Sequence, residues 1–365
     1  FVPQRLGGPA HPSATLGSPP WTLGGWQSAP GTKPWYDCRS CTQSLGIEIK
    51  KSWCGQNSPP RLWLPQGASQ APTSLMSSKL GAWTLPTKEE LRPVLANRHM
   101  MYVGDSLSGQ EFKGAIFLLS CGMGLQAVPV PGAFLKRNLT FPEFNLIVSH
   151  VRADFLVAGS TSASHDPRAS WYIDEKGVKH MIRDQGKTQF VMMDYLNVIP
   201  EMQELARHPR AVFVVNFGHW VKGHRGDVYF MLKDKKLEFS DDLRMMIYKN
   251  ITMHVAAWAQ QLLGPESYAF WHGYSAFSNS EKLCGPGQVH PWTDLQQQGV
   301  RQGVNSVQGQ AAGSRSVFLS LDCVTSNKDG SSKDAVFADS THFKMPGPPD
   351  VQSMMVWRAL GEAMR

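Results

Sequence analysis

The chain has 365 residues, of which 42% are hydrophobic and 18% are charged. This composition excludes a chain that is disordered throughout, and it supports one large domain or two close lobes. The formal net charge of +7 is scattered, and its densest run, KDKKLEF, is short. We therefore expect a solvated basic surface and no nucleic-acid partner.

Residues 1–34 are rich in Gly, Pro and Ser and have no sustained hydrophobic period, which predicts a flexible lead-in. They contain no initiator Met and no signal-peptide apolar core. No apolar run in the chain reaches the ~18 residues of a membrane-spanning helix. We expect a soluble portion, joined to a membrane only through an anchor outside this sequence.

Residues 35–81 carry three cysteines among several Trp and Pro residues, and here we expect loops joined by disulfides. Cys38-x-x-Cys41 has no second pair at zinc-finger spacing, so a disulfide is favoured over a metal. The chain has six cysteines, which permit about 15 pairings. Asn138-Leu-Thr and Asn250-Ile-Thr match the N-glycosylation sequon, and together with the cysteines they favour the secretory pathway.

From residue 82 to residue 365 the pattern changes to short apolar runs that alternate with amphipathic segments. In chain order we expect a strand over 100–104, a helix over 108–122, a bent strand or strand pair over 144–158, a helix over 200–208, a strand over 211–220, a long helix over 240–263 and a strand over 267–277. Ser240 and Asp241 supply the N-cap and early negative charge of the long helix, and Gly264-Pro265 ends it. The alternation predicts a largely parallel α/β sheet.

Ser106 follows the first of these strands in the stretch HMMYVGDSLSGQEF. A strand–turn–helix places it at the carboxyl edge of the sheet, where the helix directs N–H groups toward a developing oxyanion. Gly104 permits a tight turn, and the Asp105 carboxylate can fix it. Gly-Asp-Ser is also a common turn, so the tripeptide alone is compatible with a nucleophile or with a purely structural turn.

A serine nucleophile needs a general base, and VFADSTHFKMPGPPD near the C-terminus offers one. Asp339 and His342 form the only Asp-x-x-His in the chain. This spacing lets an acid orient an imidazole whose other nitrogen faces the serine, as in a Ser-His-Asp triad. No metal site is expected.

These motifs resemble the plant trichome birefringence-like family, within the PC-esterase group of GDSL/SGNH-type serine enzymes. The resemblance runs from about residue 35 to the C-terminus and includes CGQNSPPRLWLP, FNLIVSHVRADFLV, VVNFGHW and YAFWHGYSAF in the same order. It implies an SGNH-like sheet with flanking helices, a Rossmann-like major lobe, as a catalytic domain over 82–365. A smaller disulfide-stapled lobe would be formed in part by residues 35–81.

Carried over to this sequence, the resemblance implies that Ser106 is the nucleophile, His342 the general base and Asp339 its orienting acid. Gly104 and Asp105 match the same motif as Ser106.

Asn216, Gly218 and His219 would lie in a second active-site loop. Asn216 either donates to the oxyanion or caps the end of a strand. For His219 we favour a packed, hydrogen-bonded histidine beside Trp220 over a second base.

Two departures from the plant pattern lie close to these motifs. Ser108-Gly-Gln-Glu111 stands where plant members commonly have Ser-Arg-Asn-Gln, and His272 replaces the arginine of the Phe-Phe-Arg strand. Neither departure changes a triad residue. Acceptor recognition, however, is not carried over from the plant family to this sequence. Tryptophans such as Trp53, Trp63, Trp83 and Trp171 are candidate sugar-stacking platforms, although core packing is the favoured role for most.

The resemblance implies a Golgi enzyme that moves an acetyl group through acetyl-Ser106 to a polysaccharide hydroxyl. The acetyl donor, acetyl-CoA or a derived carrier, is a co-substrate, and no tightly bound cofactor is expected. A carbohydrate or lipid esterase would share the same acyl-enzyme and differ only in acceptor binding and water exclusion. A catalytically inactive glycan-binding protein is the third alternative.

Overall fold

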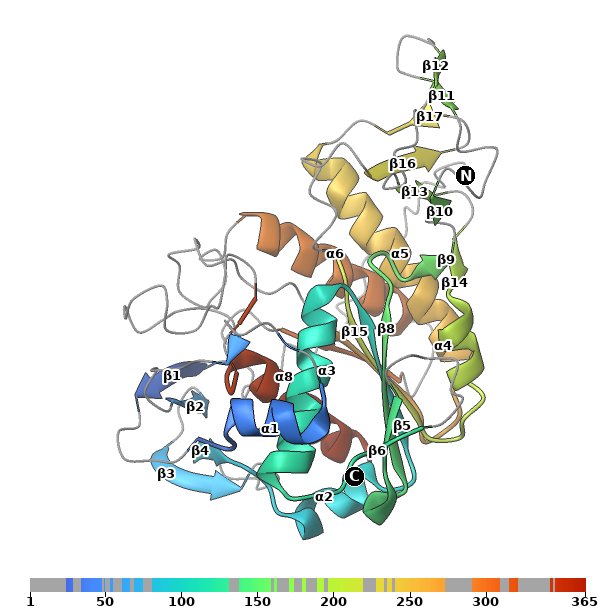
Figure 1. Cartoon of the computed structure of the whole chain (residues 1–365). Coiled ribbons are helices and arrows are strands. Elements are labelled where there is room, and N and C mark those ends of the chain that lie inside the picture. The colour runs from blue at the N-terminus through green and yellow to red at the C-terminus, as the bar shows by residue number, and fades with distance from the viewer. Residues whose placement is uncertain are drawn as a thin grey trace.

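A mixed seven-stranded sheet forms the centre of the structure, with helices on both faces (Figure 1). The structure is a computed structural model that describes residues 24–28, 34–47, 49, 53–54, 61–65, 69–74, 81–130, 138–158, 161–162, 171–173, 179–181, 189–193, 196–218, 228–232, 235–237, 240–272, 291–308, 315–320, 342–343 and 345–365. The sheet order is β19 (Ser316–Leu319), β18 (Tyr268–His272), β15 (Ala211–Asn216), β5 (His99–Gly104), β8 (Leu146–Arg152), β7 (Asn138–Phe141) and β6 (Val128–Pro129).

Strands β8, β5, β15, β18 and β19 are parallel to their neighbours, whereas β7 and β6 continue the sheet antiparallel. In chain order the parallel strands are arranged 2-1-3-4-5, so the direction of winding changes between β5 and β15. Ligand sites in open α/β sheets form at such a switch point, beyond the carboxyl ends of the strands. The predicted α/β class with a largely parallel sheet is confirmed.

The central strands β5, β15 and β18 are buried on both faces, as their nearly continuous apolar sequences allow. Met100 and Tyr102 of β5 belong to one core cluster, and Met101 and Val103 belong to the other. The first cluster includes side chains of α1 (Cys38–Leu45), α2 (Lys88–Leu95), α3 (Ser106–Phe117) and α8 (Pro348–Ala363). The second includes side chains of α4 (Pro200–Leu205), α5 (Asp241–Leu262) and α6 (Pro291–Gln308).

The long predicted helix is α5, and its start agrees with the predicted capping. The Ser240 side chain accepts a hydrogen bond from the Leu243 N–H at 3.0 Å, and Asp241 lies in the first turn. Helix α6 packs closely on α5 because it presents glycines. A Cβ at Gly303, for example, would come within 2.7 Å of the Thr252 Cβ.

The N-terminal segment differs from its expectation. Residues Gly24–Ser28, which lie inside the expected flexible lead-in, form β1 and pair antiparallel with β2 (Arg61–Pro65). Backbone pairing with a distant strand stabilises β1 without any local sequence signal. Strands β3 (Ser69–Ser74) and β4 (Gly81–Thr84) pair in parallel beside them.

Two disulfides attach α1 to its surroundings. Cys38 is bonded to Cys54, and Cys41 is bonded to Cys121, which lies in the π-helical segment Leu118–Gly122 that follows α3. Both cysteines of the Cys-x-x-Cys pair are therefore in disulfides, but with other partners and not with each other. Cys284 and Cys323 lie outside the described residues.

Shorter strands complete the described part of the chain. Strands β9 (Val157–Ala158) and β14 (Asn197–Val198) pair with each other. A six-stranded sheet, seen beside the N-terminal end of α5 in Figure 1, has the order β10 (Thr161–Ser162), β13 (Gln189–Met192), β16 (Val228–Leu232), β17 (Lys235–Lys236), β11 (Trp171–Ile173) and β12 (Lys179–Met181).

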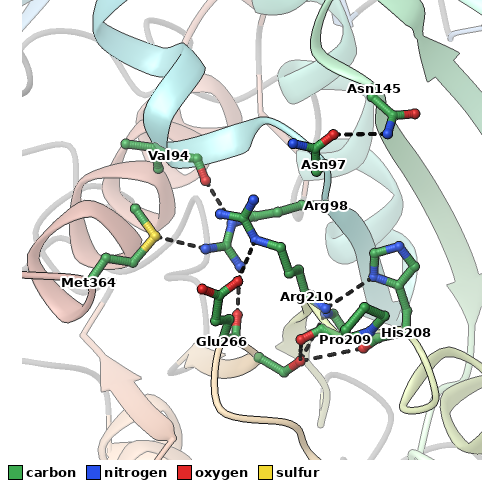
Figure 2. Close-up of polar contacts among 11 residues, drawn as sticks. Val94, Asn97, Arg98, Asn145, His208, Pro209, Arg210, Glu266 and Met364 are labelled. Carbon is green, nitrogen blue, oxygen red and sulfur yellow. Dashed lines mark hydrogen bonds and ion pairs between the residues drawn. The ribbon is translucent and has the colours of Figure 1, made fainter.

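Arg98, a buried arginine that directly precedes β5, joins elements at the amino edge of the central sheet. Figure 2 shows its contacts. The Arg98 Nε donates to the Val94 carbonyl at 2.7 Å, and its Nη1 donates to the Glu266 carbonyl at 2.7 Å. Burial, reinforced by nearby Arg210, lowers the pKa of Arg98 to about 10. The arginine links α2 to the turn before β18.

A buried carboxylate joins the N-terminal segment to α8. The Tyr36 hydroxyl donates to Asp350 Oδ1 at 2.6 Å, and the Gly347 N–H donates to Asp350 Oδ2 at 2.7 Å. Burial raises the pKa of Asp350 from 3.8 to about 7, although both hydrogen bonds act in the opposite direction. The folded protein therefore keeps this proton at pH values where the unfolded chain has lost it.

Asp350 is accordingly expected to make stability depend on pH. Its contribution is fully present below the unfolded pKa of 3.8 and is lost as the pH rises through about 7. Relative to Asp350→Asn, the free energy of unfolding of the wild type should therefore fall between pH 4 and pH 8, by about 1.4 kcal/mol for each unit of pKa difference. Chemical denaturation of both proteins across this range measures it. A wild-type advantage that grows with pH would contradict the assignment.

Candidate active site

Ser106 is the first residue of α3 and directly follows the strand–turn that ends β5. Gly104 has φ +146°, and a Cβ there would lie 1.6 Å from the Asn216 carbonyl oxygen. Only glycine allows β5 and β15 to approach so closely at this point. The turn therefore brings Ser106 to the carboxyl edge of the sheet at the switch point between β5 and β15.

Asp105 is the N-cap of α3 and is fully buried. Its Oδ1 accepts from the Leu107 N–H at 2.9 Å, and its own N–H donates to the Asn216 carbonyl at 3.3 Å. These bonds fix the turn. The Ser106 N–H lies in the first turn of α3, directly after the N-cap.

The structure brings Ser106 and His342 together across 236 positions of sequence. The His342 Nε2 lies 3.1 Å from the Ser106 Oγ, the distance expected for a nucleophile and its general base. Both side chains are partly exposed, so a substrate can reach them. Asp339, the predicted orienting acid, lies outside the described residues.

Gln110, one helical turn after Ser106, holds the segment that carries His342. Its Nε2 donates to the Phe343 carbonyl at 2.6 Å, and its Oε1 accepts from the Phe343 N–H at 3.0 Å. Gln110 is fully buried. The i, i+4 spacing places Ser106 and Gln110 on one face of α3, so the same helix presents the serine and fixes the histidine segment.

Replacing Gln110 with Ala should lower kcat about 100-fold, because small displacements of a catalytic group are costly. The reaction with a fluorophosphonate, which requires an activated serine, should slow in parallel. Gln203→Ala is the matched control, since Gln203 on α4 donates from its side chain to the backbone carbonyl of Val198. Equal activity in the two variants would show that the Phe343 contacts do not position His342.

The second predicted loop follows β15. The Asn216 side chain is 1% exposed, and neither its Oδ1 nor its Nδ2 has a hydrogen-bond partner within the described part of the chain. A buried amide without a partner is costly, so this group is available to a ligand or a water molecule. The backbone carbonyl of Asn216 accepts from Asp105, as described above.

Gly218 fixes the path of this loop. It has φ +114°, and a Cβ there would lie 2.6 Å from the Tyr248 ring. The Tyr248 hydroxyl donates to the Gly218 carbonyl at 3.1 Å, and Gln296 Nε2 donates to the Phe217 carbonyl. Burial raises the pKa of Tyr248, which keeps the hydroxyl protonated as a donor. His219 lies outside the described residues.

The two departures from the plant pattern contact each other. Glu111 Oε2 lies 3.1 Å from His272 Nδ1, and both side chains are fully buried. The contact is an ion pair when His272 is protonated, but its angles do not meet those of a hydrogen bond. His272 is the last residue of β18, and Glu111 lies on α3, so this pair joins α3 to β18.

Two of the candidate platform tryptophans have described side chains, and both are packed. Trp53 is 6% exposed and stacks on the His342 ring, with 5.0 Å between ring centroids, and Trp83 is completely buried. Core packing, the favoured role, is therefore found for both. The side chains of Trp63 and Trp171 lie outside the described part of the structure.

The sequence analysis named Trp53 only as a candidate sugar-stacking platform and Gln110 only as part of a departure from the plant pattern, and it did not single out Lys113. Lys113 Nζ lies 4.9 Å over the Trp53 ring. The i, i+4 spacing from Ser106 was a usable signal for Gln110. The residues that contact the Trp53 ring, Lys113 and His342, lie far from it in the sequence, so no local pattern predicts these contacts.

Comparisons with models of known protein families and with curated proteins find no match. Among the described residues, no group of three or more His, Cys, Asp or Glu side chains is arranged to hold a metal ion. In the same residues, no helix is both long enough and apolar enough to cross a bilayer.

Proposed function

We propose that the protein is a serine-dependent O-acetyltransferase that acts on polysaccharide hydroxyls. The observation that carries the proposal is the 3.1 Å contact between Ser106 Oγ and His342 Nε2 at the switch point of a parallel sheet. A partly exposed hydroxyl at a helix N-terminus, beside an imidazole, is suited to acyl transfer. The choice of acetyl as the transferred group and of a sugar hydroxyl as its acceptor rests on the resemblance to the trichome birefringence-like family.

In the first half-reaction, His342 Nε2 removes the proton from Ser106 Oγ as the oxygen attacks the acetyl carbonyl carbon. The tetrahedral intermediate collapses, the bond to the donor's leaving group breaks, and His342 returns the proton to that group. Acetyl-Ser106 remains. A sugar hydroxyl then loses its proton to His342 and attacks the acetyl carbon, and Ser106 departs with the proton restored. Asp339 is the proposed orienting acid.

The oxyanion needs hydrogen-bond donors that are already in place. The Ser106 N–H at the start of α3 is one proposed donor. The Asn216 amide is the other, because it ends the neighbouring strand and its Nδ2 has no partner among the described residues. We therefore prefer the oxyanion role of Asn216 to that of a simple strand cap. The buried contact between Glu111 and His272 holds α3 against β18.

The finer fold and location belong to the same proposal. We assign an SGNH-like sheet because Gly104-Asp105-Ser106 follows its first parallel strand and His342 precedes the last helix, α8. Two disulfides are typical of an oxidising compartment, which is compatible with the secretory-pathway lumen. We propose that the compartment is the Golgi, that the donor is acetyl-CoA or a derived acetyl carrier, and that the acceptor is a polysaccharide.

An esterase is the second candidate, and the partial exposure of Ser106 and His342 favours it. Water that reaches acetyl-Ser106 would take the place of the sugar hydroxyl and release acetate. Transferase and hydrolase share every step up to the acyl-enzyme.

The deciding experiment uses purified protein, a radiolabelled acetyl donor and a panel of neutral oligosaccharides, with Ser106→Ala as control. Intact mass analysis detects acetyl-Ser106, and chromatography separates acetylated sugar from free acetate. We expect label on the wild-type serine and its transfer to at least one oligosaccharide.

If acetate is released at a rate that does not depend on the sugar, the esterase hypothesis is favoured over the transferase hypothesis. No serine adduct and no turnover with acetyl-CoA or an activated acetyl ester would reject both enzymes. Glycan binding without turnover would then support the inactive binding protein.

A further inference from the structure

The imidazole ring of His342 has two described contacts. Its edge faces Ser106, and its face lies against the Trp53 indole. The Trp53 and His342 rings are 5.0 Å apart between centroids, with an angle of 28° between their planes. His342 Nε2 is directed at Ser106 at 3.1 Å. The histidine thus has one partner at its reactive nitrogen and another across its ring.

Trp53 is held in place by bonds that do not involve the imidazole. Its carbonyl accepts from the Met345 N–H at 2.7 Å, and its neighbour Cys54 is bonded to Cys38. The same helix, α1, is anchored to the end of α3 through Cys41 and Cys121. The indole is therefore a fixed surface against which the His342 ring lies.

A fixed indole face affects the charge of the ring that lies on it. The face of an aromatic ring is electrostatically negative and attracts a cation. His342 becomes an imidazolium when it takes the Ser106 proton, so stacking on Trp53 favours the protonated state formed during reaction. On α3, Lys113 Nζ lies 4.9 Å over the Trp53 ring, and the N-cap of this helix is the carboxylate of Asp105, next to Ser106. On α8, the buried Asp350 is bonded to Tyr36 and Gly347 instead.

We propose that Trp53 is a positioning residue of this site, which fixes the plane of the His342 ring and stabilises its imidazolium form. Lys113 opposes the second effect, because a permanent cation at the same indole repels the imidazolium. The inference rests on the proposed function for its catalytic meaning, but the effect on His342 is a property of the folded protein.

NMR titration of the imidazole tests this without any need for turnover. The His342 signal is identified by its loss in His342→Gln, and its titration midpoint is compared among wild type, Trp53→Phe, Trp53→Leu and Lys113→Met. Leucine keeps an apolar neighbour but removes the aromatic face. We expect Trp53→Leu to lower the midpoint by about half a pH unit and Trp53→Phe to lower it less. Lys113→Met should raise it.

The pH profile of acetyl-ester cleavage supplies the catalytic reading. The ascending limb should move with the NMR midpoint, and kcat should fall about tenfold in Trp53→Leu with recovery in Trp53→Phe. Unchanged midpoints in both Trp53→Leu and Lys113→Met would overturn the inference, even if Trp53→Leu were slow or unstable. Shifted midpoints in a protein without turnover would uphold it and reject the proposed function.

Discussion

Ser106→Ala and His342→Gln should each lower kcat for acetyl-ester cleavage by about 10⁴- to 10⁶-fold, and the double variant should be no slower than the slower single variant. A serine without its base and a base without its serine lose the same step, so the two losses overlap instead of multiplying. The 3.1 Å contact between them is the reason to expect one functional unit. Steady-state kinetics of the three variants measure the overlap.

Matched controls are available elsewhere in the chain. Ser306→Ala changes a serine on α6 whose hydroxyl donates to the Gln302 carbonyl of the same helix. His254→Gln changes a histidine on α5, across the sheet from α3. Both controls should retain nearly full activity. Losses that multiply in the Ser106/His342 double variant would show that the two residues act independently.

The largest expected effect on stability comes from the buried Glu111–His272 pair. Glu111→Met or His272→Leu alone should lower the free energy of unfolding by about 3–5 kcal/mol, because each leaves an uncompensated polar group in the core. The double variant should be much more stable than the sum of the losses predicts, and close to wild type, since two packed apolar side chains remove both groups together. Guanidinium denaturation of the four proteins completes the cycle.

A surface pair provides the comparison for this cycle. Lys88 Nζ lies 3.0 Å from Glu143 Oε2, but the side chains are 32% and 41% exposed. Glu143→Gln should change stability by no more than about 1 kcal/mol. If the Glu111 and His272 losses were simply additive, their 3.1 Å contact would contribute nothing, and the pair would be two independent buried groups.

The parallel sheet was predictable where the sequence carries uninterrupted apolar runs. Strands β5 and β15 are such runs, and the Ser240 cap marked the start of α5. Helix α2 was not predicted, although Thr87 and Glu90 form a capping box that was visible in the sequence. Helix α6 was not predicted either, because its glycines lower the helix propensity of the segment. Its contacts with α5, which only the tertiary structure supplies, make those glycines useful.

The candidate site could be predicted only in part, because most of its contacts join distant segments. The strand–turn–helix located Ser106, and the Asp-x-x-His pattern located His342. Nothing local indicated that Gln110 would bind the backbone of Phe343, 233 residues away. The cysteine spacings likewise left the pairing open, and Cys41 is bonded to a cysteine 80 residues along the chain.

The disulfide anchorage of α1 has a practical consequence for making the protein. Cys41–Cys121 and Cys38–Cys54 connect the end of α3 to the residue that follows Trp53. Production in a reducing cytosol would remove the covalent links that anchor the segment of Trp53, so material from such a host can be soluble and still have a misplaced histidine. Secretion into an oxidising compartment, with residues 34–54 retained, is therefore the appropriate source of protein for any assay of Ser106.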